Sequence, residues 1–284
     1  MSAITLLIHC KDQSGIIAAV TTFIHSSGGN IVYIDQHVDR ENSTFFMRLE
    51  SEFHPERFSL DAFRASFANG LAHTYNLSWQ LYTSDYKPKM AVFVSKYDHC
   101  LHDILGRYNS GEWHVEIPII ISNHEDLRPL ANNYSIPFHC VPVSAETKKE
   151  AEEQQLELLR AAGVDFIVLA RYMQIVTSGL IKQYPNKIIN IHHSFLPAFV
   201  GAKPYHSAYK RGVKIIGATS HYVTEELDAG PIIEQDVARV SHTHSINDLV
   251  RKGRDLEKIV LATAIKLHID RKTMVYNNKT VIFY

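Results

Sequence analysis

From residue 90 onward, short apolar runs alternate with stretches whose apolar residues recur at helical spacing. The strand-like runs are Met90–Val94, Val115–Ile121, Phe138–Val143, Phe166–Leu169 and Ile188–Ile191, and the helical stretches are Leu101–Tyr108, Leu127–Tyr134, Thr147–Ala162 and Leu180–Tyr184. Alternation of this kind is typical of a mostly parallel sheet with helices on both faces. We therefore predict an α/β domain of the Rossmann-like class for this part of the chain.

The end of the chain departs from this alternation. Lys214–Tyr222 and Ile232–Val240 resemble two strands of an antiparallel extension. Ile246–His268 has the spacing of a long amphipathic helix, with Ser245 as its cap. We expect the last residues, 277–283, to form a turn and a short edge strand.

The first 82 residues have a different order of elements. A strand-like run, Ile4–His9, precedes a helical stretch that starts at Ile16, and two alternating runs at 30–38 and 43–49 follow as a hairpin. A second helical stretch, 58–71, and a last strand, 76–82, complete a β-α-β-β-α-β unit, which is the ferredoxin-like arrangement. A polar segment with a proline, 83–89, follows it, so we predict two domains, 1–84 and 85–284.

Charge and cysteine content limit the possible partners. Lys and Arg total 29 against 30 Asp and Glu. Because the chain has no excess of positive charge, nucleic acid is not an expected partner, and we expect a small-molecule substrate. The three cysteines are odd in number and never spaced as CxxC, which argues against a disulfide framework and a zinc site. There is neither a secretory leader nor an apolar run long enough for a membrane span, so we expect a cytoplasmic protein.

The polar residues that end the run at 188–191 are the first candidates for a site, because open parallel sheets bind ligands at the carboxyl ends of their strands. Asn190 and His192 are two residues apart, so a strand places both side chains on one face and turns His193 to the other. A carboxylate, Asp228, lies in a loop before a Gly-Pro turn. Without further context Asp228 could be a turn residue only.

Two groups of motifs carry a resemblance to known families. Asn190-Ile-His192, Ser194-Phe-Leu-Pro197, Gly201, His221 and Asp228-Ala-Gly-Pro-Ile232 resemble the signature of the folate-dependent formyltransferases, over about residues 89 to 283. His193 and the stretch after Gly201 are similar to the deformylase branch of that family. The leading unit resembles an ACT domain, since Asp12, Gly15, Ile16 and Ile17 follow its effector-loop pattern. A fusion of these two units is the arrangement of the deformylase branch.

The resemblance implies roles for individual residues. Asn190 and a protonated His192 would hold the oxyanion that forms when water attacks a formyl carbon. Asp228 would exchange protons with the water and the departing folate nitrogen, which calls for an environment that permits exchange near neutral pH. His221 would orient the site, and Arg171 and Met173 would lie against the pteridine. Gly201 belongs to the same signature. The resemblance implies that the reaction needs no metal or other cofactor.

The choice between hydrolysis and formyl transfer depends on the second substrate. Ribonucleotide transferases of this family bind the acceptor phosphate with a glycine-rich loop after the first strand of the domain, whereas this chain has Val94-Ser-Lys-Tyr-Asp-His-Cys-Leu101 there. The loop has no glycine and contains an acid, so water is the expected acceptor. The expected reaction is hydrolysis of 10-formyltetrahydrofolate to tetrahydrofolate and formate, which would feed purine synthesis and balance the one-carbon pool. Formyl transfer to a small acceptor and an inactive folate or amino-acid sensor remain as alternatives.

Several residues keep a second interpretation. His193 either holds water or Asp228, or only orients a loop. Asp12 and Gly15 either bind an amino-acid effector with Ile16, or form a helix cap and a tight turn. We expect a homo-oligomer, a dimer or a tetramer, because ACT units commonly pair.

Overall fold

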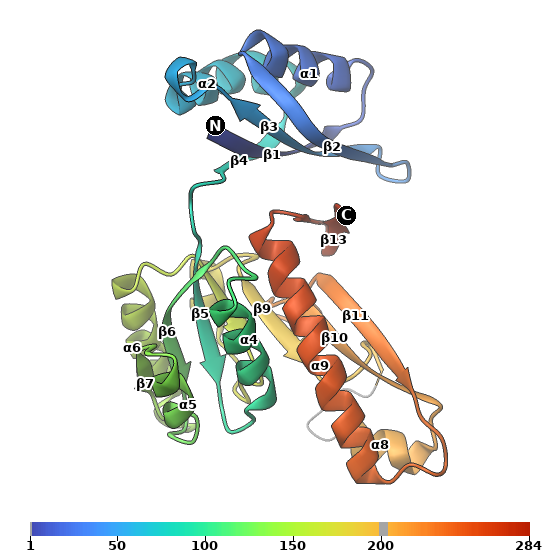
Figure 1. Cartoon of the computed structure of the whole chain (residues 1–284). Helices are drawn as coiled ribbons and strands as arrows, with labels where there is room; N and C mark the ends of the chain where they lie inside the picture. Colours follow the sequence, from blue (N-terminus) through green and yellow to red (C-terminus); the bar gives the residue numbers. More distant parts are fainter. Residues whose placement is uncertain (1, 199–203) are drawn as a thin grey trace. The chain divides into compact units, whose positions relative to one another are not determined.

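The computed structural model describes residues 2–198 and 204–284, which divide into two units, Met1–Lys87 with Phe283–Tyr284, and Pro88–Ile282 (Figure 1). The first unit contains β1 (Ser2–Lys11), α1 (Ile16–Ser26), β2 (Gly29–Asp39), β3 (Thr44–Phe53), α2 (Leu60–Phe67) and β4 (Ser78–Thr83). Its strands form one antiparallel sheet in the order β2-β3-β1-β4. The predicted β-α-β-β-α-β unit is therefore confirmed.

The core of this unit follows from the period of its strands and helices. Ile4, Leu6 and Ile8 alternate along β1 and are buried on one face of the sheet. Ile16, Val20 and Ile24 form the apolar stripe of α1 in the same core. Short helical turns extend this unit: η1 (Pro55–Arg57) precedes α2, and η2 (Ala68–Ala72) and α3 (His73–Tyr75) follow it.

The second unit is built on a seven-stranded sheet in the order β11-β10-β9-β8-β5-β6-β7. Its first part contains β5 (Lys89–Val94), α4 (His99–Asn109), β6 (Glu116–Ser122), α5 (Arg128–Asn133), β7 (Phe138–Cys140), α6 (Lys148–Ala161), β8 (Phe166–Leu169), α7 (Ser178–Gln183) and β9 (Ile188–His192). These five strands are parallel, and β10 (Ile215–Tyr222) and β11 (Ile232–Arg239) extend the sheet in antiparallel fashion. Both features match the prediction.

Helices cover both faces of this sheet. Met90, Val92 and Val94 of β5 pack with α4 and α9 (Ile246–Ile269), whereas Ala91 and Phe93 pack against α6 and α7 on the other face. The helices α4 and α9 lie side by side (Figure 1). Ser245 caps α9, as expected, in a reciprocal pair of hydrogen bonds with Asp248.

Three details differ from the sequence predictions. β7 ends at Cys140 rather than at Val143, because Pro142 has no backbone N–H to continue the ladder. A helix that the periodicity did not indicate, α8 (Pro204–Arg211), follows β9. The tail forms a hairpin, β12 (Thr273–Tyr276) with β13 (Lys279–Ile282), instead of a single strand. Asn277 and Asn278 both have positive φ, which suits a tight hairpin turn.

No helix among the described residues is both long enough and apolar enough to cross a membrane.

Candidate active site

Asn190, His192 and His221 are brought together by the pairing of β9 with β10. These strands run antiparallel, and Asn190 lies directly opposite His221 in the register. The side-chain Nδ2 of Asn190 is 3.2 Å from Nε2 of His221. His192 lies two residues further along β9, on the same face as Asn190, as the strand period predicts.

Asp228 reaches this group from the loop that follows β10. Its Oδ2 lies 3.2 Å from Nδ1 of His192, and its Oδ1 lies 3.7 Å from Nε2 of His221. The backbone of Asp228 has φ 55°, a left-handed conformation that aspartate tolerates better than most residues. Gly230 lets this loop close onto β10, because a Cβ at that position would lie 1.8 Å from the carbonyl oxygen of Tyr222.

The hydrogen-bond partners assign the imidazole protons. Nδ1 of His221 donates to the carbonyl oxygen of Tyr222 at 2.9 Å, so Nε2 is the acceptor and takes a proton of the Asn190 amide. The second N–H of Asn190 remains for a ligand. Nδ1 of His192 faces Asp228, and its Nε2 is buried without a hydrogen-bond partner in the described ranges 2–198 and 204–284. These contacts thus leave one N–H of Asn190 and Nε2 of His192 as the polar groups that a ligand can use.

The same contacts set the charge of Asp228. The N–H of His192 is the main cause that holds the pKa of Asp228 far below its ordinary value, although partial burial acts in the opposite direction. The carboxylate is therefore ionised at neutral pH. The sequence expectation of an environment that permits proton exchange near neutral pH does not hold in this arrangement, because the N–H of His192 stabilises the anion.

His193 does not point away from His192. The strand ends at His192, so the alternation of side chains stops there, and the two imidazole rings stack at 5.2 Å with 17° between their planes. The prediction that His193 lies on the opposite face is therefore wrong. The ring of His193 also lies against Tyr205, with 6.1 Å between the centroids.

A cleft of about 360 Å³ opens beside these groups. It is lined by the loop after β8, by the residues that end β9 and by the loop after β10, namely Leu169, 171–176, 190–193, His221 and 223–228. Its volume is within the range of small-molecule sites, and a few polar groups converge in a mostly apolar lining. The segment 223–227 was not predicted to belong to the site, because exposed loop residues carry no periodic signal.

The loop after β8 places Arg171 and Met173 in the lining of the cleft. Met173 is 43% exposed, and its backbone N–H donates to Ser95 Oγ at 3.0 Å. Arg171 is buried, with its guanidinium 4.8 Å from the ring of Tyr97 and its Nε 3.5 Å from Glu257 Oε2. The charged end of Arg171 is therefore engaged inside the protein, while the residue still borders the cleft. The predicted Gly201 lies outside the described residues.

The residues predicted to bind an effector also meet in one place. Asp12, Gly15 and Ile16 line a hollow of about 450 Å³ in the first unit, together with residues of β2 such as Gln36. Gly15 caps α1 with φ 93°, a conformation that favours glycine. The hollow is thus formed by a tight turn, a helix start and a neighbouring strand.

Comparisons with known proteins cover both units. Residues 88–265 match the family model of formyl transferases, and residues 4–58 match that of ACT domains. The chain is 51% identical to a formyltetrahydrofolate deformylase of Synechocystis sp. over 98% of each chain, and 46% identical to one of Bacillus subtilis over 98% of this chain and 93% of that one.

Solved structures give the same result. A formyltetrahydrofolate deformylase from Pseudomonas syringae superposes with a TM-score of 0.96 at 46% identity, covering 100% of this chain and 95% of that one. A glycinamide ribonucleotide transformylase from Symbiobacterium toebii superposes with a TM-score of 0.68 at 28% identity. It covers 72% of this chain and 98% of its own. The transformylase thus matches only part of the chain, whereas the deformylase matches both units.

Proposed function

Because this chain belongs to the formyltetrahydrofolate deformylase family, we propose that it hydrolyses 10-formyltetrahydrofolate to tetrahydrofolate and formate. The observation that carries the proposal is the convergence of Asn190, His192 and Asp228 at one wall of the cleft, with one amide N–H and one imidazole nitrogen left for a ligand. A formyl oxygen needs such donors when it becomes an oxyanion.

In the proposed mechanism the pteridine lies between the loops after β8 and β10, and the formyl group faces His192. Water attacks the formyl carbon, and the charge on the formyl oxygen is held by the free N–H of Asn190 and by Nε2–H of protonated His192. The carboxylate of Asp228 stabilises that imidazolium and orients the water. The bond between the formyl carbon and the folate nitrogen then breaks, which releases formate.

Because the pKa of Asp228 is low, the carboxylate accepts a proton only after water has attacked the formyl carbon. An ionised carboxylate of low pKa is a poor base toward water itself, but the oxygen added to the formyl carbon is far more acidic than water. Asp228 takes the proton from that oxygen and passes it to the folate nitrogen, so the nitrogen leaves as a neutral amine. The reaction needs neither a metal nor another cofactor.

The loop after β5 supports water as the acceptor. Ser95 Oγ donates to Asn123 Oδ1 at 2.6 Å and accepts from the N–H of Met173, while His99 Nε2 lies 2.7 Å from Glu257 Oε2. These polar side chains are engaged with protein partners, and the loop has no glycine to bring backbone donors close to a phosphate. Formyl transfer to a phosphorylated acceptor is therefore the weaker alternative, and an inactive sensor would have no use for Asp228.

We infer a regulatory role for the first unit. The hollow at Asp12, Gly15 and Ile16 supports the binding of a small effector such as an amino acid, of which glycine and methionine are the first to test.

Val32 and Ile34 are exposed on β2, an edge strand, which supports pairing of two copies through this unit. A homo-oligomer, a cytoplasmic location and the use of the formate in purine synthesis belong to this proposal. Light scattering tests the oligomer.

The experiment that tests the function is formate release from 10-formyltetrahydrofolate with no acceptor present. The proposal expects formate and tetrahydrofolate in equal amounts. Strict dependence on an added ribonucleotide would favour the transferase, and folate binding without turnover would favour the sensor.

A further inference from the structure

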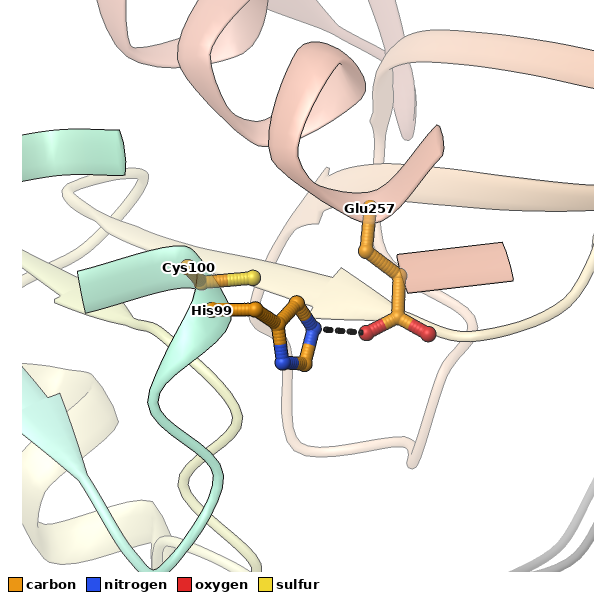
Figure 2. A group of neighbouring side chains, drawn as sticks. All are labelled: His99, Cys100 and Glu257. Carbon is orange, nitrogen blue, oxygen red and sulfur yellow. Dashed lines mark hydrogen bonds and ion pairs between the residues drawn. The ribbon is translucent and has the colours of Figure 1, made fainter. Parts of the chain in front are cut away.

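The buried carboxylate of Glu257 joins three segments of the second unit, one of which, the loop after β8, lines the cleft. Glu257 lies on α9 and its side chain is 1% exposed. His99, at the start of α4, approaches Oε2, and Figure 2 shows its ring directed at the carboxylate. Tyr205 of α8 donates its hydroxyl to Oε1 at 2.6 Å, and Arg171, from the loop after β8, lies 3.5 Å from Oε2.

His99, Cys100 and Glu257 lie close enough together to suggest a metal site, but their chemistry does not fit one (Figure 2). Both carboxylate oxygens already accept hydrogen bonds, and the guanidinium of Arg171 would repel a cation. Burial raises the pKa of the Cys100 thiol well above its ordinary value, which disfavours the thiolate in this apolar setting. The group is better understood as a set of contacts to an anion.

Glu257 is ionised in this setting. Burial raises the pKa of its carboxyl, but the hydrogen bond from His99 and the charge of Arg171 more than offset it, and the net pKa lies below the ordinary value. A hydroxyl that donates to a carboxylate makes a stronger hydrogen bond than one that donates to a neutral acceptor. The hydroxyl of Tyr205 is therefore held firmly.

The ring of Tyr205 fits into a slot on α9. Gly253 precedes Glu257 by four residues, so both lie on one face of the helix. A Cβ at position 253 would lie 2.1 Å from Cζ of Tyr205, which shows that the ring occupies the space that a side chain would need. Gly253 thus makes room for the ring while Glu257 binds its hydroxyl.

Tyr205 in turn lies against the histidines of the site. Its ring is tilted against His193, which stacks on His192. A cavity of about 90 Å³ borders both Tyr205 and His193, so packing does not hold these rings on that side. On that side, the contacts that α9 makes with Tyr205 hold its ring against His193.

We propose that Tyr205 is a positioning residue for deformylation: α9 fixes its ring through Gly253 and Glu257, the ring supports His193, and His193 supports His192. The inference rests on the proposed function. It extends the site from the residues that line the cleft to α9, a helix that does not line it.

The first test is Tyr205→Phe, which removes only the hydroxyl. Without its bond to Glu257 the ring can move toward the cavity, so kcat for formate release should fall about tenfold to hundredfold, with KM changed little. Tyr209→Phe is the matched control, since this tyrosine lies one turn later on α8 and is exposed. It should keep the wild-type kcat.

The second test is Gly253→Ala, whose methyl group would displace the Tyr205 ring together with its hydroxyl, since Cζ and the hydroxyl oxygen both lie 2.1 Å from the added Cβ. It should lower kcat in the same way, and in a Tyr205→Ala background it should have no further effect. Unfolding curves for each variant separate lost stability from lost positioning. Glu257 itself is not substituted, because its removal would leave Arg171 as an unpaired buried charge.

The outcomes distinguish the two proposals. If wild-type protein releases no formate, the proposed function fails. If wild-type protein is active and folded Tyr205→Phe protein has the same kcat and KM, only the positioning role is overturned. A lower unfolding temperature with unchanged kcat would likewise overturn it, since that is the result of a purely structural contact.

Discussion

Asn190 on β9 and His221 on β10 are direct cross-strand neighbours, and the imidazole of His221 accepts one N–H of the Asn190 amide at 3.2 Å. Because Nδ1 of His221 is itself fixed by the carbonyl oxygen of Tyr222, the amide is held in one orientation. The second N–H then points where a ligand oxygen can use it.

This relationship predicts how two substitutions combine. Asn190→Ala should lower kcat by about 10²- to 10³-fold, the usual effect of losing one oxyanion donor. His221→Ala should lower it less, because the amide remains but is no longer oriented. The double variant should be little worse than Asn190→Ala alone, as measured by kcat for formate release. Fully additive losses would mean that His221 acts independently of Asn190.

Asp228→Asn should separate binding from chemistry. The amide keeps the shape of the side chain but can neither accept the proton of the added water nor stabilise a charged His192. We expect kcat to fall by about 10²- to 10⁴-fold, the range for a general acid–base group. Folate binding, followed by fluorescence or calorimetry, should be largely kept. Full activity of the Asp228→Asn protein would remove Asp228 from the mechanism.

The low pKa of Asp228 also predicts a pH effect on stability. Since folding lowers this pKa, the ionised carboxylate stabilises the fold above its unfolded value of about 3.9, and that contribution is lost as the pH falls through the folded value. The free energies of unfolding of wild type and Asp228→Asn should therefore differ most at pH 5 and above, and the difference should begin to shrink as the pH falls below about 4. Urea titrations at several pH values measure this, and a difference that grows on acidification would contradict it.

If the hollow in the first unit binds an effector, a substitution there should remove the response to the effector without changing catalysis. If glycine or methionine changes the rate of formate release, Asp12→Ala should abolish that change and leave the basal rate intact, because Asp12 lies in the other unit from the catalytic groups. Asp61→Ala, an exposed acid of α2 that does not line the hollow, is the control. A response that persists in Asp12→Ala protein would place the effector elsewhere.

The sequence was enough to predict both folds, because strand and helix periods alternate clearly and Ser245 marks the start of α9. It also placed Asn190 and His192 on one face, since that depends only on the period of a strand. The prediction for His193 was wrong because the sequence did not show where the strand ends. β9 ends at His192, so the next residue, His193, stacks on it.

Other features required knowledge of the tertiary contacts. The low pKa of Asp228 arises mainly from its contact with His192 on β9, whereas Asp228 itself lies in the loop after β10, a proximity that no local pattern encodes. Glu257 and Gly253 are consistent with any amphipathic helix, and only the packing of Tyr205 against them reveals a special role. α8 was missed because it is short and polar apart from a few residues.

The central claim is that water accepts the formyl group, and isotopic labelling tests it most directly. The protein is given 10-formyltetrahydrofolate in water enriched in ¹⁸O, without any other acceptor, and the formate is analysed by mass spectrometry. The account predicts formate that carries one oxygen from the solvent, formed at the rate of tetrahydrofolate release. Formate that forms only with an added acceptor, or a formyl group that appears on that acceptor without label, would contradict it.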